Sequence, residues 1–293
     1  MLNVNNINIY YGRKHIIKDA SFQINPGEIV GLIGPNGAGK TTIMKTLLGL
    51  TKFTGSVTFN GQEVTASNHK ALQQVGALIE NPAIYPFLTG MENLKLYSNS
   101  DKDLQKLILR MGMDSYINEP AKSYSIGMKQ KLGIALALLN NPKLVILDEP
   151  MNGLDIEATI LIRKLIHDYA ANGTAFLISS HVLSELQKVM TYVIILNHKE
   201  IVMNAPIDEF KKTKVTHYQL ITDSNQQADN LLTDNNVKLT TKNNAFIVQA
   251  QDINYIQKLL YQNNISLIEL TPIRKTFEQS IVDILREKWG RED

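Results

Sequence analysis

Residues 34 to 42 read Gly34-Pro35-Asn36-Gly37-Ala38-Gly39-Lys40-Thr41-Thr42, which fits the pattern G-x-x-x-x-G-K-[ST]. The apolar run 29–33 (Ile-Val-Gly-Leu-Ile) comes directly before this stretch and is expected to form a buried strand. Apolar residues follow it at helical spacing: Ile43, Met44, Leu47 and Leu48. A strand, a glycine-rich turn and a helix, in this order, are the context in which the pattern predicts a phosphate-binding loop.

The residue types in this stretch suit phosphate binding. Glycines allow successive backbone N–H groups to point inward as an anion-binding nest, and the start of the helix adds the positive end of its dipole. We expect Lys40 to reach the β- and γ-phosphates and the Thr41 hydroxyl to be a ligand of Mg²⁺. The alternative, an ordinary glycine-rich turn, is disfavoured by the flanking strand and helix. The sequence therefore predicts that the chain binds a nucleoside triphosphate.

The composition is that of a globular protein. The 293 residues suit two domains, or one large and one small domain, and 44% of them are hydrophobic. A formal net charge of +2 argues against a nucleic-acid-binding protein driven by bulk electrostatics. The absence of cysteine rules out disulfides and thiolate metal sites and fits a reducing compartment. The sequence shows neither a signal peptide nor an apolar run of the roughly 18 residues that span a bilayer, so we expect a soluble protein.

Two regions, residues 1 to about 80 and about 141 to 205, alternate short strand-like runs with helical patterns. Their apolar runs predict strands of a largely parallel α/β sheet, buried on both faces: 29–33, 57–59, 144–147, 175–179 and 192–196. Residues from about 82 to 140 are helical in character, and four apolar residues share one helix face: Leu104, Leu107, Ile108 and Met111. We therefore expect an α/β core of the P-loop NTPase type with an inserted helical subdomain.

The composition changes after about residue 210, where Asn, Gln, Thr and Asp become frequent and glycine is absent until Gly290. The pattern predicts, in order, strand 216–222, helix 225–232, strand 237–240, strand 245–249, helix 253–262, strand 265–270 and a last helix 274–289. The order β-α-β-β-α-β of the first six elements is that of a ferredoxin-like unit. We expect an ATP-binding domain at 1–210 and a small accessory α+β domain at 211–293.

A second motif supplies carboxylates, because the apolar strand 144–147 ends in Asp148-Glu149-Pro150. In P-loop NTPases such a strand lies beside the phosphate loop and its terminal Asp holds Mg²⁺, so we assign Asp148 to the metal. Glu149 then projects toward the γ-phosphate, where we expect it to orient or deprotonate the attacking water. The alternative is a simple strand-ending turn. His181 follows the predicted strand 175–179, and this position favours a contact with the γ-phosphate over an ordinary surface histidine.

A third motif occupies residues 124–128, Tyr-Ser-Ile-Gly-Met. Ser125 and Gly127 at the start of a helix form a second anion-binding end. One chain folds around one nucleotide, so this second end needs a phosphate from elsewhere. A second subunit supplies that phosphate most simply.

Together these motifs resemble those of the ATP-binding subunits of ATP-binding-cassette (ABC) transporters, over residues 1 to about 210. The stretch 34–42 is similar to the Walker A motif, 144–149 to Walker B, Asn152-Gly-Leu-Asp155 to the D-loop, and 124–128 to the family signature. His181 is similar to the switch histidine, and Tyr11, just before Gly12, is similar to the aromatic residue that stacks on adenine. The resemblance therefore adds Tyr11 and Asp155 to the expected nucleotide site.

The resemblance implies an ATPase that uses ATP and Mg²⁺ and works as a homodimer or paired with another ATPase subunit. Each ATP would lie between Lys40 of one copy and Ser125 and Gly127 of the other. ATP binding would close the dimer and hydrolysis would reopen it, which would drive separate membrane-spanning transporter subunits. The implied location is cytoplasmic, peripheral on the inner face of the cell membrane, and no nucleic acid is expected as a partner.

The sequence departs from the family pattern at two places. The family signature usually reads L-S-G-G-Q, whereas here Ile126 and Met128 replace a glycine and an amide side chain while Ser125 and Gly127 remain. The family normally carries Gln where Glu80 stands, at a position that senses Mg²⁺ and the attacking water. We expect Glu80 still to reach the metal shell and to tune hydrolysis or coupling through its added charge near the γ-phosphate. A solvent-facing Glu80 is the alternative.

Both departures, together with Tyr85-Pro86 after Glu80, resemble the bacitracin-resistance and lantibiotic-immunity branch of the family. That branch exports membrane-active peptide antibiotics in Gram-positive bacteria, which implies a peptide antibiotic or similar amphiphile as the substrate. The family also has a groove for a coupling helix of the membrane partner near 81–93, an apolar and aromatic segment here. Internal packing of this segment is the alternative.

Two other functions stay open. An ABC-type ATPase can act without transport, but ribosome-associated relatives usually carry two cassettes and DNA-repair relatives carry long coiled coils, and this sequence shows neither. Alternatively, the C-terminal domain would sense a small ligand and regulate the cassette. No ligand site is recognisable in 265–270 or its flanking helices, so support of the dimer is the favoured role of that domain.

Overall fold

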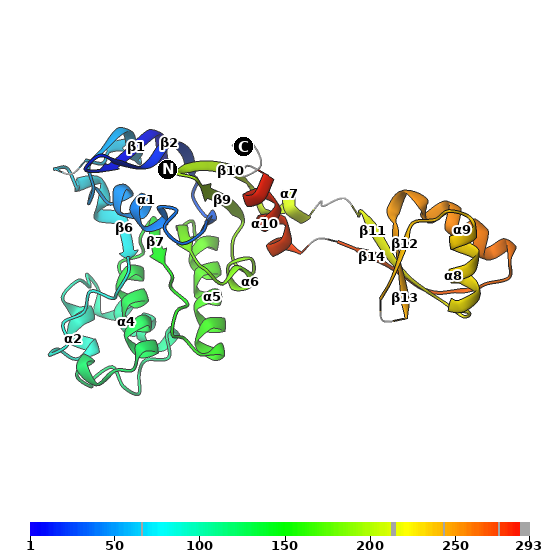
Figure 1. Ribbon diagram of the computed structural model, residues 1–293. Helices are drawn as coiled ribbons and strands as arrows, with labels where there is room; N and C mark the ends of the chain where they lie inside the picture. The colour runs from blue at the N-terminus through cyan, green and yellow to red at the C-terminus, as the bar shows by residue number, and fades with distance from the viewer. Residues whose placement is uncertain (66, 212–214, 243, 275, 288–293) are drawn as a thin grey trace. The chain divides into compact units, whose positions relative to one another are not determined.

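The computed structural model describes residues 1–65, 67–211, 215–242, 244–274 and 276–287. The chain forms two compact units, the first ending at Ile207 and the second beginning at Asp208 (Figure 1). The first unit contains two sheets and the second unit one, and each unit has its own cluster of buried apolar side chains. In the part of the chain that the structure describes, no helix is both long enough and apolar enough to cross a membrane.

A six-stranded sheet forms the centre of the first unit. Its strands are β3 (Ile29–Ile33), β6 (Val75–Leu78), β7 (Leu144–Asp148), β8 (Ala175–Ser179), β9 (Tyr192–Asn197) and β10 (Glu200–Pro206). They lie in the order β10-β9-β3-β8-β7-β6, and all neighbours are parallel except β10, which is antiparallel to β9. Every residue of β3, β7 and β8 is buried, as is typical of apolar strands covered on both faces.

A second, antiparallel sheet belongs to the same unit. Its strands are β1 (Leu2–Tyr11), β2 (Lys14–Ile24), β4 (Phe53–Phe59) and β5 (Gln62–Glu63), in the order β2-β1-β4-β5. The prediction that 57–59 belongs to the parallel sheet was wrong, because these residues end β4. Val57 and Phe59 are buried while Ser56 and Thr58 are only partly covered, and this alternation is typical of a sheet with one face on the core.

Helix α1 (Lys40–Leu47) packs within the core that the two sheets share. Its residues Ile43 and Met44 are fully buried, and they belong to one apolar cluster with Val30 of β3 and Ile9 of β1. The helix that follows the phosphate loop is therefore fixed against both sheets.

The segment between β6 and β7 contains α2 (Gly90–Lys95), α3 (Asp101–Arg110), a 3-10 turn (Ala121–Ser123) and α4 (Ile126–Leu138). Another 3-10 turn, Lys70–Gln74, comes directly before β6. The four apolar residues assigned to one helix face are all buried: Leu104, Leu107, Ile108 and Met111. Helix α4 lies close to β6, because a Cβ at Gly76 would overlap the backbone of Ala137. Two further helices, α5 (Ile156–Ala171) and α6 (Leu183–Leu186), follow β7 and β8.

The second unit begins within α7 (Ile207–Lys211). Its further elements are β11 (His217–Thr222), α8 (Asn225–Asp234), β12 (Leu239–Lys242), β13 (Ala245–Gln249), a 3-10 turn (Ala250–Asp252), α9 (Ile253–Gln262), β14 (Leu267–Ile273) and α10 (Phe277–Glu287). The strands form an antiparallel sheet in the order β12-β13-β11-β14. The bounds of β13 and α9 are those predicted, whereas β14 begins later than predicted. Residues 275, 288 and 289 of the predicted last helix lie outside the described residues.

Candidate active site

The phosphate loop connects the end of β3 to the start of α1 at Lys40. Gly39 has a φ of 106°, in the left-handed region that favours glycine, and a Cβ there would lie 2.6 Å from Cδ1 of Ile17. At Gly34 a Cβ would run into the backbone oxygen of Leu196 in β9. Glycine at these two positions therefore lets the loop pack tightly between β2 and β9.

Lys40 folds back over its own loop. Its Nζ donates hydrogen bonds to the carbonyl oxygens of Gly34, at 2.8 Å, and Pro35, at 3.2 Å. Burial lowers the pKa of Lys40, and the charges of Glu149 and Asp148 partly oppose this shift. The ammonium group thus lies inside the curve of the loop and within electrostatic reach of both carboxylates.

Thr41 and Asp148 meet at one edge of the sheet. The Thr41 Oγ1 donates to Oδ2 of Asp148 at 2.6 Å, and the Ser179 Oγ donates to Oδ1 at 2.5 Å. Strands β3, β8 and β7 are parallel neighbours, so their carboxyl ends bring the phosphate loop, Ser179 and Asp148 together. Sequence reasoning missed Ser179, although its place as the last residue of a buried strand beside β7 is the signal that would have found it.

Glu149 and His181 form the second contact between predicted site residues. The Glu149 Oε2 lies 2.7 Å from Nδ1 of His181 and also accepts a hydrogen bond from the backbone N–H of His181 at 3.1 Å. The backbone of Glu149 is left-handed, with a φ of 52°, and its N–H donates to the Ser179 Oγ at 3.0 Å. The amide of Gln130, a second residue that sequence reasoning missed, donates to the Glu149 carbonyl at 3.1 Å. Glu149 is thus held by contacts from β8, from α4 and from the residues after β8.

Glu80 follows β6 and has a left-handed backbone, with a φ of 61°. Its Oε1 accepts a hydrogen bond from Nζ of Lys45 in α1 at 2.7 Å. This hydrogen bond raises the pKa of Lys45, burial opposes the shift, and the charges of Glu80, Tyr11 and Asp148 add to it. Glu80 therefore lies beside the phosphate-loop helix with a lysine as its partner, a residue that the sequence had not singled out.

Tyr11 is the last residue of β1, and about half of its side chain is exposed. The neighbouring Tyr10 stacks on His15, with ring centroids 4.2 Å apart. Tyr11 is within electrostatic reach of Lys45, the residue of α1 that pairs with Glu80.

The remaining predicted residues form a second group, at the starts of α4 and α5. Ser125 caps α4 by accepting a hydrogen bond from the Met128 N–H at 3.2 Å, and Asp155 caps α5 by accepting one from Ala158 at 2.7 Å. A Cβ at Gly127 would lie 2.9 Å from the oxygen of Gly153. Gln130, on α4, reaches from this second group to Glu149 in the first.

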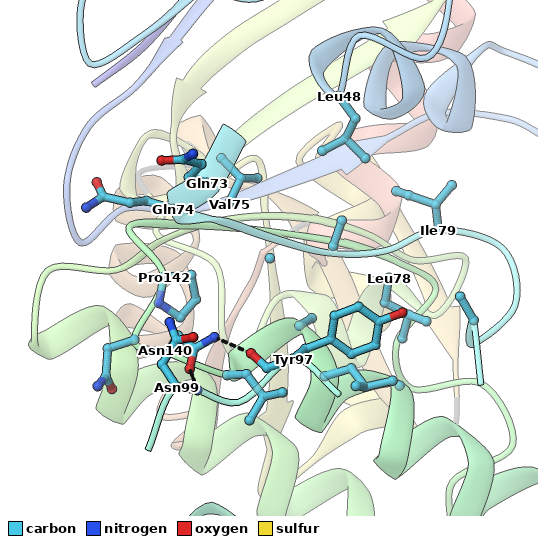
Figure 2. Close-up of a pocket in the computed structure, with 18 of the residues that line it drawn as sticks. Leu48, Gln73, Gln74, Val75, Leu78, Ile79, Tyr97, Asn99, Asn140 and Pro142 are labelled. Atoms are coloured by element: carbon cyan, nitrogen blue, oxygen red, sulfur yellow. Dashed lines mark hydrogen bonds between the residues drawn. The ribbon is translucent and has the colours of Figure 1, made fainter. Parts of the chain in front are cut away.

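A pocket of about 910 Å³ lies on the outer side of β6, the edge strand of the six-stranded sheet (Figure 2). Tyr97 points into it, and the carbonyl of Tyr97 accepts a hydrogen bond from Nδ2 of Asn140 at 2.7 Å. Interaction with the Tyr85 side chain raises the pKa of Tyr97, and the 81–93 segment reaches the pocket through Asn81 and Ala83. Its apolar lining includes Leu48, Leu50, Val75, Leu78, Ile79 and Leu136.

Comparisons with known proteins show the family to which the chain belongs. The family model described as ABC transporter matches residues 17–152. A protein of Bacillus subtilis (strain 168), described as the uncharacterized ABC transporter ATP-binding protein YdbJ, is 36% identical over 96% of this chain and 94% of its own length. The lantibiotic transport ATP-binding protein SrtF of Streptococcus pyogenes is 37% identical over 71% of this chain and 92% of its own. The bacitracin transport ATP-binding protein BcrA of Enterococcus faecalis is 36% identical over 72% and 71%.

A solved structure described as the ATP-binding subunit of an ABC transporter superposes with a TM-score of 0.68 and 28% identity, over 72% of this chain and 92% of that one. The fold and the phosphate loop show that the chain is of the P-loop nucleotide-binding class. Within that class, the chain belongs to the ABC transporter family and is an ATP-binding subunit of an ABC transporter. The expected likeness to lantibiotic and bacitracin transport proteins is confirmed by the relatives found.

Proposed function

We propose that this subunit hydrolyses ATP with Glu149 as the general base and so drives export of a peptide antibiotic or a similar amphiphile. The observation that carries the proposal is the position of the Glu149 carboxylate. It directly follows Asp148, whose carboxylate meets Thr41 of the phosphate loop, and it is held by His181 at 2.7 Å. A carboxylate at this place is within the region where the γ-phosphate and its attacking water would lie.

Thr41 of α1 and Asp148 at the end of β7 are suited to bind Mg²⁺. The hydroxyl of Thr41 and the carboxylate of Asp148 are hard oxygen donors in contact with each other, and Mg²⁺ is commonly held by one or two such groups together with substrate phosphates. Among the described residues no cluster of three or more His, Asp or Glu side chains could hold a metal alone. Thr41 and Asp148 would hold the ion, with Glu80 near its shell, and the ion would neutralise charge that develops on the phosphates.

The other side chains complete the chemistry. Lys40 would exchange the carbonyls of its own loop for phosphate oxygens, and the backbone N–H groups of the loop would bind the same phosphates. Glu149 would accept a proton from the attacking water at Oε2, while His181 would keep the carboxylate oriented and contact the γ-phosphate. Tyr11 would stack on the adenine.

A second copy of the ATPase subunit would complete each site. Ser125 and Asp155 are exposed at the starts of α4 and α5. Their neighbours Ile126 and Ile156 are large apolar side chains that are 76% and 80% exposed. Exposed apolar residues beside an anion-binding helix start support a face that pairs with another subunit and its nucleotide.

Transport partners and substrate follow from the relatives and from the pocket beside β6. SrtF and BcrA are named for lantibiotic and bacitracin transport, which supports a peptide antibiotic as the substrate here. The pocket, which Tyr97 lines, would together with the neighbouring 81–93 segment receive a coupling helix of a membrane-spanning subunit. This docking would place the subunit on the cytoplasmic face of the membrane.

The second unit would be a ferredoxin-like accessory domain that supports the dimer. Its order of elements, β-α-β-β-α-β, and its sheet order β12-β13-β11-β14 support this assignment. Its separate core, which includes Leu220, Phe246 and Ile256, supports treating it as a domain of its own.

The test is ATP turnover by Glu149→Gln beside the wild type. We expect turnover to fall at least ~100-fold, because the general base is lost, while the affinity for ATP stays within a few-fold. Lys40→Ala is the matched control and should lose ATP binding itself. A Glu149→Gln variant that hydrolyses ATP at the wild-type rate would contradict the assignment of the base.

A further inference from the structure

The ion pair between Lys45 and Glu80 joins α1 to the residue that follows the edge strand β6, with Nζ 2.7 Å from Oε1. We propose that Lys45 is a positioning residue that holds Glu80 and balances its charge. The phosphates of ATP would then meet a neutral pair at this corner of the site instead of a third carboxylate. The inference rests on the nucleotide site proposed above and adds to it a residue that no family motif names.

The position of Lys45 supports this role. Lys45 lies one helical turn after Thr41, so the two side chains share a face of α1. Thr41 contacts Asp148, and Asp148 and Tyr11 both act electrostatically on Lys45. The ion pair therefore lies beside the expected metal and nucleotide positions.

The charge balance at the nucleotide site also supports the proposed role of Lys45. Asp148, Glu149 and Glu80 would bring three carboxylates toward the triphosphate, and Lys40 is one cation that would face them. Lys45 adds the charge that offsets Glu80. Its side chain is 30% exposed and that of Glu80 is 58% exposed, so water screens part of the interaction. The effect on nucleotide affinity is therefore expected to be several-fold and not thousands-fold.

Backbone geometry at Glu80 points the same way. A φ of 61° is uncommon for a residue with a side chain, and it persists when the surroundings hold it. The hydrogen bond from Lys45 helps to stabilise this backbone conformation, since it fixes the end of the Glu80 side chain against α1.

The experiment measures ATP affinity of the full chain by calorimetry at low salt in EDTA, where Mg²⁺ is absent and no hydrolysis occurs. We expect Lys45→Met to weaken ATP binding by about three- to tenfold, because it leaves Glu80 unbalanced. Glu80→Gln should tighten binding by a similar factor, because it frees the Lys45 ammonium. The double variant and Lys45→Arg, which keep the charge balance, should each stay within about twofold of the wild type.

Lys102→Met, an exposed lysine on α3, is the matched control and should bind ATP like the wild type. Melting temperatures of all variants show that each is folded. Equal affinities of Lys45→Met and Lys102→Met, or weaker binding by Glu80→Gln, would overturn the proposal. Because binding is measured in EDTA, a wild type that binds ATP but never hydrolyses it would contradict the proposed ATPase function and leave this inference standing.

Discussion

The hydroxyl of Ser179 connects the two carboxylate residues that follow β7. It donates to Asp148 and accepts from the N–H of Glu149, and its side chain is fully buried. Both neighbours bear on the proposed chemistry, since Asp148 would hold the metal and Glu149 would act as the base. A fully buried serine thereby helps to set the orientation of both.

We predict that Ser179→Ala lowers the free energy of unfolding by about 1–3 kcal/mol, because a buried carboxylate oxygen and a backbone N–H each lose a partner. Urea denaturation of the full chain measures this free energy, from the unfolding transition of the first unit. Ser123→Ala is the control, because Ser123 is exposed and its hydroxyl donates to the nearby Pro120 carbonyl; its change should be within about 0.5 kcal/mol. Equal stabilities of the two variants would contradict the role given to Ser179.

Local sequence patterns predicted the candidate residues but not the side chains that join them. The spacing around Lys40 and the carboxylates after a buried strand were readable because each motif is contiguous. Gln130 and Lys45 contact residues that are distant in the sequence, so no local spacing signals them, and only the position of Ser179 at the end of a buried strand could have pointed to it. The contacts Thr41–Asp148 and Glu149–His181 are present in the structure. The catalytic and metal roles of these residues stay predictions.

At the scale of elements, burial pattern decided what could be predicted. Continuous apolar runs such as β7 and β8 were recognised as buried parallel strands. The alternating pattern of β4 was assigned to the wrong sheet, because three residues show whether a strand is apolar but not which partner it pairs with. In the second unit, β13 and α9 have the predicted bounds because each has a distinct period and a polar flank.

The pocket beside β6 gives a prediction at this scale. Tyr85 is 44% exposed and lies beside Phe87, with ring centroids 5.8 Å apart, and its side chain raises the pKa of Tyr97, which lines the pocket. We predict that Tyr85→Ala reduces co-purification with the membrane-spanning subunit by about tenfold, since an aromatic anchor at an interface contributes about 1–2 kcal/mol or more.

Affinity for ATP should remain unchanged in Tyr85→Ala. Tyr261→Ala, which removes an exposed tyrosine of the second unit, is the control and should co-purify like the wild type. Lost ATP binding in Tyr85→Ala would instead make Tyr85 a residue needed for folding of the first unit.

At the scale of the whole molecule, the chain joins a nucleotide-binding unit to a smaller α+β unit, and the division at Ile207 and Asp208 lies beside the predicted boundary at 210. The sequence could indicate that boundary because composition changes there. The sequence indicates pairing of two subunits through Ser125 and Gly127. In the proposed arrangement these residues would bind the nucleotide held by Lys40 of the other subunit, and not the nucleotide of their own chain.

The mass of Glu149→Gln in solution, measured by light scattering with and without MgATP, tests most directly whether ATP is shared between two subunits. Without hydrolysis the closed state should accumulate. We predict the 32.9 kDa monomer without nucleotide and about twice that mass with MgATP, with Lys40→Ala monomeric in both conditions as the control. A Glu149→Gln variant that binds MgATP at saturation and still has the monomer mass would contradict ATP-driven pairing.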